Sequence, residues 1–144
     1  MYTKILVPLD GSTLAEKVLP HAQALAKAEG AELVLLRIPL PPSPEFFARN
    51  PGLGVSIIED AEIETETYLQ KEVSELQKQG AHVTSMISEG PVPDTIIAVA
   101  ENIHADLIAM STHGRTGIQR MLLGSVADKV VNLSPIPVML IHPN

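Results

Sequence analysis

Short apolar segments alternate along this chain with longer segments of helical periodicity, and this alternation restricts the possible folds more than any other feature. Five segments are predicted strands: 5–9, 32–38, 82–88, 106–110 and 138–141. Segment 82–88 is less apolar than the others, which places it nearer an edge of the sheet. Helices are predicted between Ser12 and Gly30 and at 56–79, 95–102 and 124–132. Such alternation predicts a parallel sheet with helices on both faces. The 144 residues are predicted to form one α/β domain, residues 1–144.

Prolines and capping residues mark the limits of these segments. Ser12 is predicted to cap the first helix and Gly30 to end it. Because proline cannot donate a ladder hydrogen bond, we expect Pro8 where strand pairing stops. The five prolines between residues 39 and 54 predict a loop without regular structure. In the long helix that follows, the predicted inner face consists of Ile58, Ala61, Thr65, Leu69, Val73 and Leu76.

Composition excludes several classes of function. The net charge of −7 repels nucleic-acid backbones and anionic membranes. The chain has no tryptophan, two tyrosines and two phenylalanines, too few for a platform that stacks single-stranded nucleic acid. Without cysteine it has neither a disulfide framework nor a thiolate zinc site. No apolar run approaches the roughly 20 residues that span a bilayer, and no signal-peptide pattern is present. We expect a soluble, cytoplasmic protein that binds neither nucleic acid nor membrane.

A glycine-containing loop follows the fourth predicted strand. It runs from Met110 to Gly117 and on to Gly124-Ser125-Val126, where the last helix begins. Backbone N–H groups of such a loop can face an anion, and the helix N-terminus adds a partial positive charge. Glycines allow a phosphate to approach the backbone closely, and the Ser125 hydroxyl can donate a hydrogen bond to it. Arg115 and Arg120 place cations nearby. The loop therefore predicts a phosphate site.

The same loop resembles the nucleotide loop of the universal stress protein family. That pattern is Gly, two residues, Gly, nine residues, Gly and then Ser or Thr. Gly114 matches the second glycine and Gly124-Ser125 the closing pair, whereas Ser111 replaces the first glycine. The resemblance extends over the whole chain, from Ile5-Leu6-Val7-Pro8-Leu9-Asp10-Gly11-Ser12 to Pro135-Ile136-Pro137-Val138.

The resemblance implies an open, five-stranded parallel sheet of order 3-2-1-4-5, the flavodoxin-like topology that adenine nucleotide alpha hydrolases share. A ligand then binds at the carboxyl ends of strands one and four, where the strand order reverses. Pro8 would line the ribose, Ile38 would border the adenine, and Asp10 would contact either group. Ser111 would lie against ribose and phosphates. The implied site residues are Pro8, Asp10, Ile38, Met110, Ser111, Gly114, Gly124, Ser125 and Val126.

The family further implies the ligand and the assembly. The expected ligand is ATP, or else AMP or another adenine nucleotide, and a Mg²⁺ ion can bridge its phosphates. The expected assembly is a homodimer through the apolar edge strand Val138–Ile141. The implied role is a regulatory or binding module of the stress response.

Other interpretations of these residues remain open. Asp10 is also a natural turn or helix-capping aspartate, and Gly114 and Gly117 are also ordinary turn glycines. His113 can hydrogen-bond a phosphate or Asp10, or else stabilise the loop. No Walker lysine is present, and a catalytic triad that joins Asp10 and His113 to a serine lacks the GxSxG elbow. No metal-ligand spacing is present among the histidines.

Two alternative functions follow. The first is a dimeric family member that has lost its nucleotide and acts through protein partners, which the serine at position 111 favours. The second is a slow nucleotide-hydrolysing or nucleotide-transferring enzyme of related fold. No dedicated base or water-positioning residue is evident beside the loop, so we expect no enzyme, and at most slow ATP hydrolysis.

Overall fold

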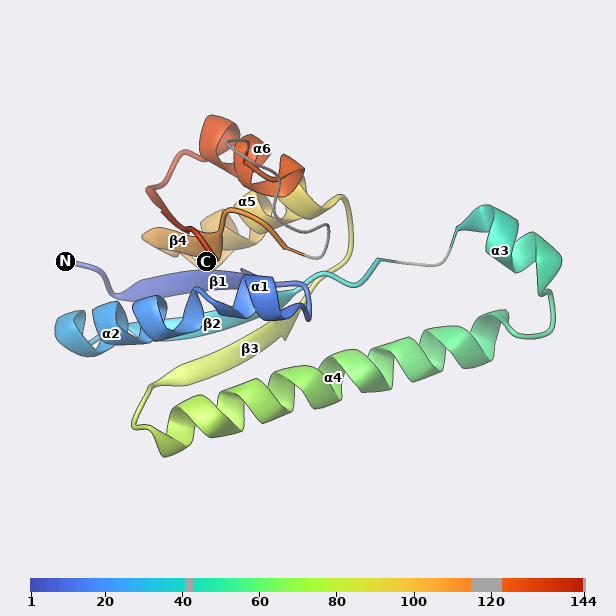
Figure 1. Ribbon diagram of the computed structural model, residues 1–144, viewed down its shortest axis with the longest axis horizontal. Coiled ribbons are helices and arrows are strands. Elements are labelled where there is room, and N and C mark those ends of the chain that lie inside the picture. Colours follow the sequence, from blue (N-terminus) through green and yellow to red (C-terminus); the bar gives the residue numbers. More distant parts are fainter. Residues whose placement is uncertain (41–42, 115–122, 144) are drawn as a thin grey trace.

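The architecture follows from one parallel sheet. The computed structural model describes residues 1–40, 43–114 and 123–143 (Figure 1). Its strands are β1 (Lys4–Leu9), β2 (Glu32–Arg37), β3 (Val83–Ile87), β4 (Leu107–Ser111) and β5 (Val138–Ile141). Its helices are α1 (Thr13–Glu16), α2 (Leu19–Glu29), α3 (Pro44–Arg49), α4 (Gly54–Lys78), α5 (Val92–Asn102) and α6 (Ser125–Leu133). All five predicted strands are present, and the last has the predicted bounds.

The sheet order is β3-β2-β1-β4-β5, with every pairing parallel, which confirms the implied topology. β1 pairs with β2 along its whole length, but its pairing with β4 stops after Leu6 and Ile108. Pro8 lies just beyond that point and has no N–H with which to continue the ladder. The two central strands therefore separate at their carboxyl ends, where the strand order reverses.

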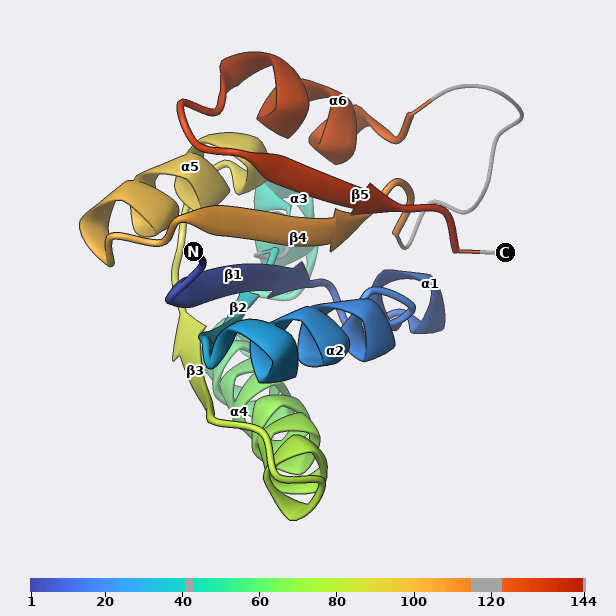
Figure 2. The same cartoon turned by 90° about the vertical axis from the view of Figure 1, so that its left-hand side faces the viewer.

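Helices cover both faces of the sheet (Figure 2). Successive residues of a strand point to opposite faces. Val7 and Leu35 accordingly pack with α2 and α4, through Ala22 and Leu69 among others. Leu6, Leu36 and Ile108 pack on the other face with α5 and α6. The central strands β1, β2 and β4 have helices on both faces, and their sequences are accordingly nearly continuous apolar runs.

The predicted first helix is two helices. Ser12 caps α1 as expected, accepting a hydrogen bond from the Ala15 N–H at 3.1 Å, and Gly30 ends α2 with a φ of 70°. Between them the chain leaves the α-helical pattern at Lys17 and Val18. Pro20 stands in the first turn of α2, where its missing N–H costs nothing. Helical spacing across Lys17 and Val18 concealed the break.

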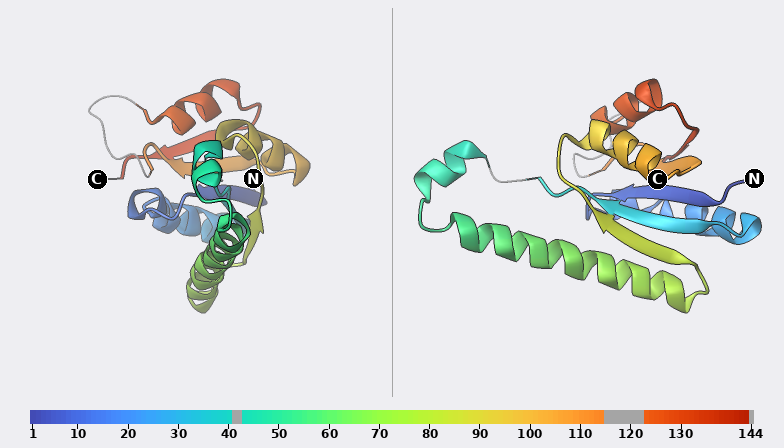
Figure 3. Two further views of the ribbon diagram at one scale, coloured as in Figure 1. Left: turned by 90° about the vertical axis from the view of Figure 1, so that its right-hand side faces the viewer. Right: turned by 180° about the vertical axis from the view of Figure 1, so that it is seen from behind.

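The segment between β2 and α4 also departs from the prediction. α3 forms within the expected irregular loop: Ser43 caps it by accepting from the Phe46 N–H at 3.2 Å, and Pro44 occupies its first turn. Here proline starts a helix instead of preventing one. α3 and the amino-terminal half of α4 project beyond the sheet (Figures 1 and 3). The predicted inner face of α4 therefore holds from Thr65 onward: Thr65 is 3% exposed and Leu69 2%, but Ile58 is 42% exposed.

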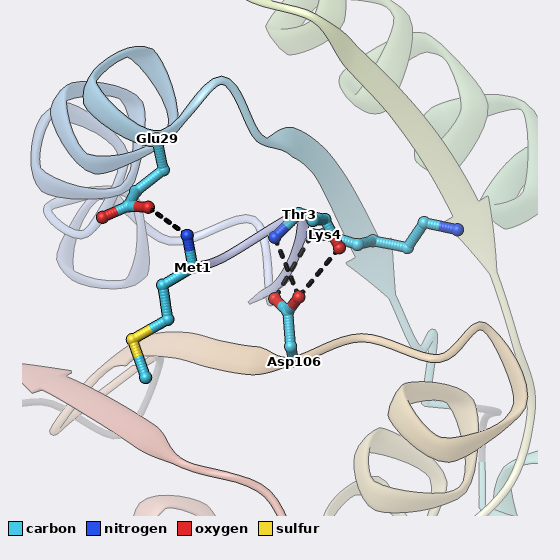
Figure 4. A network of polar contacts seen from close by, with 5 residues as sticks. All are labelled: Met1, Thr3, Lys4, Glu29 and Asp106. Atoms are coloured by element: carbon cyan, nitrogen blue, oxygen red, sulfur yellow. Dashed lines mark hydrogen bonds and ion pairs between the residues drawn. The ribbon is translucent and has the colours of Figure 1, made fainter.

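At the amino-terminal edge of the sheet, Asp106 joins β4 to β1 (Figure 4). Its carboxylate accepts from the Thr3 N–H at 2.8 Å, the Thr3 hydroxyl at 2.9 Å and the Lys4 N–H at 3.2 Å. The Met1 amino group pairs with Glu29 at 2.7 Å beside it. Partial burial raises the Asp106 pKa, but the hydrogen bonds from Thr3 and Lys4 outweigh it, and the pKa lies below its ordinary value.

Across the described residues, the structure has no helix long and apolar enough to cross a membrane.

Candidate functional site

A cavity of about 210 Å³ lies at the carboxyl ends of β1, β2 and β4. It occupies the point where β1 and β4 separate, as the rule for open parallel sheets predicts. Nine of its lining residues are those singled out from the sequence: Pro8, Asp10, Ile38, Met110, Ser111, Gly114, Gly124, Ser125 and Val126. The structure thus brings residues from β1, β2, β4 and α6 around a single cavity.

The pleat of the strands decides which side chains face the cavity. Met110 packs in the apolar core beneath α5 and α6, as does Ile38, which follows β2. Leu36 and Ile96 complete this apolar wall. Pro8 alternates in β1 with residues of the opposite core and so lies on the same side. An apolar wall with a few polar groups at its rim is typical of sites for small organic ligands.

Asp10 has the turn role that the sequence left open, and it also lines the cavity. Its Oδ1 accepts from the Ser12 N–H at 2.9 Å and from the Ser12 hydroxyl at 2.6 Å. Gly11 completes the turn with a φ of 86°, a conformation that favours glycine. The carboxylate is thereby held at the cavity rim by its own turn.

Ser111 faces away from the cavity's apolar wall. Its hydroxyl lies 2.9 Å from the Leu14 carbonyl oxygen and 3.0 Å from that of Ala15, at the end of α1. The residue is 6% exposed and alternates with Met110, whose side chain lies on the other face. The serine that replaces the first glycine of the motif therefore joins β4 to α1. Ser111 directly follows Met110 in the strand, and successive strand residues point to opposite faces. This alternation is the sequence signal that would have indicated the orientation of Ser111.

The two described loop glycines are in close contact with the protein itself. A Cβ at Gly114 would clash with the Asp10 carboxylate, and a Cβ at Gly124 would lie 2.8 Å from the Thr112 carbonyl oxygen. That carbonyl accepts a hydrogen bond from the Gly124 N–H at 2.8 Å. The sequence interpretation assigned the glycines to close approach of a phosphate; the structure adds close packing of the loop on β1 and β4. Gly117, Arg115 and Arg120 lie outside the described residues.

The N-terminus of α6 opens onto the cavity. Gly124 is its N-cap, no side chain caps it in the described structure, and Ser125, Val126 and Ala127 line the cavity. The first-turn N–H groups of a helix have no partner within the helix, and the helix dipole favours an anion there. This end of the cavity is suited to a phosphate.

His113 lies in the same rim and is 6% exposed. Its Nδ1 lies 3.0 Å from the Thr112 hydroxyl oxygen. Its Nε2 is buried without a hydrogen-bond partner in the part of the chain that the structure describes. The Ser12 hydroxyl bonds to Asp10 and the histidine to Thr112, so the described residues form no Ser–His–Asp relay. The sequence left the role of His113 open, and Thr112 was not singled out.

A second polar cluster, unanticipated from the sequence, lies behind Asp10's turn. The Arg37 guanidinium stands 5.1 Å from the centre of the Tyr68 ring and lies against Gly11. The Tyr68 hydroxyl donates to Glu16 at 2.7 Å. Burial, with the Glu16 carboxylate beside it, raises the pKa of Tyr68 well above its ordinary value. The cluster fixes α4 against α1. Among the described residues, no group of three or more His, Asp or Glu side chains could hold a metal ion.

Comparison with known proteins gives a consistent result. A profile of the universal stress protein family matches residues 1–142. Universal stress protein MJ0531 of Methanocaldococcus jannaschii is 33% identical over 141 residues, which cover 98% of this chain and 82% of that protein. The solved structure of MJ0577, from the same organism, has a TM-score of 0.82 at 29% identity and covers 99% of this chain and 96% of its own. The structure of the universal stress protein from Archaeoglobus fulgidus in complex with dAMP has a TM-score of 0.69 at 25% identity. The match covers 96% of this chain and 97% of that one.

Proposed function

This chain belongs to the universal stress protein family, and from that premise we propose that its cavity binds an adenine nucleotide, with ATP as the favoured ligand. The observation that carries the proposal is the convergence of nine residues, from β1, β4, α6 and the loops that adjoin the strands, on one cavity beside the α6 N-terminus. Adenine would lie against the apolar wall at Ile38 and Met110. The phosphates would lie at Gly124 and Ser125. The dAMP complex of the relative from Archaeoglobus fulgidus supports a nucleotide of this kind.

The size of the cavity supports this division. Its volume of about 210 Å³ is below the roughly 300–1,000 Å³ typical of sites that enclose a whole drug-sized ligand. We therefore place the base and ribose inside it and the phosphates at its mouth, against the first turn of α6. A Mg²⁺ ion would bridge phosphate oxygens there and complete its coordination with water.

The orientation of Ser111 bears on the alternative that this chain has lost its nucleotide. That alternative drew its support from the serine that replaces a motif glycine. Because the Ser111 hydroxyl bonds to the Leu14 and Ala15 carbonyls, the added side-chain atoms lie toward α1. The substitution thus leaves the apolar wall unobstructed, and we favour nucleotide binding over a role through protein partners alone.

Titration calorimetry with ATP, AMP and GTP tests the proposal, together with mass spectrometry of any small molecule that co-purifies. We expect a micromolar dissociation constant for ATP, which corresponds to a binding free energy of about −8 kcal/mol. Ser125→Ala is expected to weaken binding, because it removes a hydroxyl at the phosphate end; the matched control is Ser74→Ala, an exposed serine on α4. Absence of both heat and thermal shift at millimolar ATP would refute nucleotide binding.

We further propose that the protein acts by binding and not by catalysis, as a homodimeric regulatory module of the stress response in the cytoplasm. Ordinary enzymes turn over at about 10 per second. ATP hydrolysis is expected to be far slower, since the sequence offers neither a Walker lysine nor an evident general base. The proposal is contradicted if the protein hydrolyses ATP at about 10 per second and keeps that rate when Asp10 and His113 are replaced. Such a result would show that the chain has a catalytic site.

A further inference from the structure

We infer that His113 makes the site selective for phosphorylated adenosine: its Nε2–H donates a hydrogen bond to a phosphate oxygen of the nucleotide, and the Thr112 hydroxyl holds the ring in the tautomer that can donate. The inference rests on the proposed function and assigns a specificity-determining residue to it. It starts from one atom, the buried Nε2 that has no partner in the described part of the chain.

A buried polar nitrogen without a partner is unusual. More than about 90% of buried polar groups in folded proteins are hydrogen-bonded, and an unsatisfied one destabilises the fold. His113 is 6% exposed, so water offers little compensation. The residue lines the cavity, so the proposed partner of this nitrogen is a phosphate oxygen of the nucleotide bound there. A polar atom left unsatisfied in the free protein is a means of selecting ligands that supply the missing partner.

The Thr112 hydroxyl determines which nitrogen carries the proton. Thr112 is 1% exposed, and within the described residues the acceptor available to its hydroxyl is His113 Nδ1, at 3.0 Å. In the proposed arrangement this buried hydroxyl donates its proton to Nδ1, and Nδ1 accepts. In a neutral imidazole the other nitrogen then bears the proton. Nε2 is therefore a donor, which suits a phosphate oxygen and not another donor.

The position of His113 places this donor at the phosphate end of the cavity. The residue immediately precedes Gly114, and a Cβ at Gly124 would lie 3.5 Å from the His113 Cα. Gly124 is the N-cap of α6, so the backbone of His113 lies beside the helix N-terminus that favours an anion. Ile38, in the wall proposed for adenine, follows β2, which lies on the other side of β1 from β4 and its loop. Donor and helix N-terminus can thus contact the same phosphate group.

Calorimetry with adenosine, AMP and ATP on four proteins tests the inference. His113→Phe keeps a ring but removes the donor; His113→Gln keeps an N–H donor of similar reach; His82→Gln changes an exposed histidine outside the cavity. A hydrogen bond to a charged group contributes about 1.5–3 kcal/mol, so we expect His113→Phe to weaken ATP or AMP about 10- to 100-fold. The affinity of His113→Phe for adenosine should fall less than about twofold. His113→Gln should recover part of the affinity for ATP that His113→Phe loses.

The inference is contradicted if His113→Phe weakens the binding of adenosine as much as that of ATP, or if it leaves the binding of ATP unchanged. Nitrogen-15 NMR of the unaltered protein provides a measurement that needs no variant of the site to fold. We expect the Nε2–H tautomer in the free protein, and an Nε2 shift that changes on saturation with ATP but not with adenosine. An Nδ1–H tautomer, or an Nε2 shift that ATP leaves unchanged, would overturn the inference. Failure of the unaltered protein to bind any nucleotide would instead overturn the proposed function, and this inference with it.

Discussion

The Asp10 carboxylate occupies the space in which a side chain at Gly114 would lie. Asp10 follows β1, Gly114 lies in the loop after β4, and both line the cavity. Their contact therefore connects the β1 and β4 segments of the site at the point where the two strands separate. The absence of a Cβ at position 114 is therefore a requirement of the protein's own packing, before any ligand is present.

Gly114→Ala is predicted to lower the free energy of unfolding by about 1–3 kcal/mol, the usual cost of an added methyl group in a filled space. Gly52→Ala is the matched control, because a Cβ there would meet no atom within 4 Å. Urea denaturation measures both. If the cause is the clash with Asp10, the cost of Gly114→Ala should be smaller in an Asp10→Ala background. An equal cost in both backgrounds would place the cause elsewhere.

Ser111→Ala is predicted to destabilise the protein by about 1 kcal/mol, since it leaves the Leu14 and Ala15 carbonyls without the serine hydroxyl. Ser74→Ala, on the exposed face of α4, should change stability by less than half as much. Because the hydroxyl faces α1, any loss of ATP affinity should be smaller than that of His113→Phe. A Ser111→Gly variant that binds ATP more than about tenfold tighter would show that the serine obstructs the site after all.

The sheet was predictable because its signals are local. The strands β1, β2 and β4 are mostly buried apolar runs. Pro8 cannot donate a ladder hydrogen bond, and Gly30 ends α2 in the left-handed conformation that favours glycine. The resemblance supplied the strand order, which periodicity alone does not contain. The break before α2 escaped prediction because Val18 and Leu19 both remain buried and preserve the helical spacing across it. The exposure of Ile58 depends on where α4 leaves the sheet, which is a tertiary property.

The site was predictable to the level of which residues gather, but not of what each side chain contacts. All nine residues line one cavity because strand ends and the loop were placed correctly. The Ser111 hydroxyl and the Thr112–His113 pair depend on the strand pleat and on one side-chain torsion each. Arg37 over Tyr68 joins residues of β2 and α4, and no local pattern links them.

Asp106→Asn is predicted to make the protein less stable at neutral pH by about 1–2 kcal/mol, because a carboxylate accepts the Thr3 and Lys4 hydrogen bonds more strongly than an amide. Since the folded pKa lies below the ordinary value of 3.8, this contribution is complete above 3.8 and is lost as the pH falls from there through the lower folded pKa. Unfolding free energies measured from pH 7 to pH 3 should converge for the two proteins. Asp60→Asn, at an exposed position of α4, is the control. A gap that widens on acidification would contradict the assignment.

Leu140→Pro is predicted to prevent dimer formation while leaving the sheet intact. β5 is an edge strand, and the carbonyls of Pro137 and Ile141 accept hydrogen bonds from the N–H groups of Ile108 in β4 and of Thr112 just after it, at 3.0 and 2.9 Å. The N–H and C=O of one strand residue point to the same side and alternate along the strand, so those of Leu140 point outward. An outward N–H is available to a second copy of the strand, as expected for a symmetric dimer. Proline removes this donor without removing a bond to β4.

Light scattering at tens of micromolar checks the dimer, and circular dichroism checks the sheet. We expect the unaltered chain to be a dimer and the proline variant a monomer or an aggregate with unchanged secondary structure. Leu140→Ala keeps the N–H and is the matched control; it should remain dimeric, with weaker association from the smaller apolar contact. The edge strand is excluded as the interface if the unaltered chain is a stable monomer, or if the proline variant dimerises as well as the alanine variant. Because β5 pairs with the strand that carries Met110 and Ser111, dimerisation would also hold the cavity's β4 wall from its outer side.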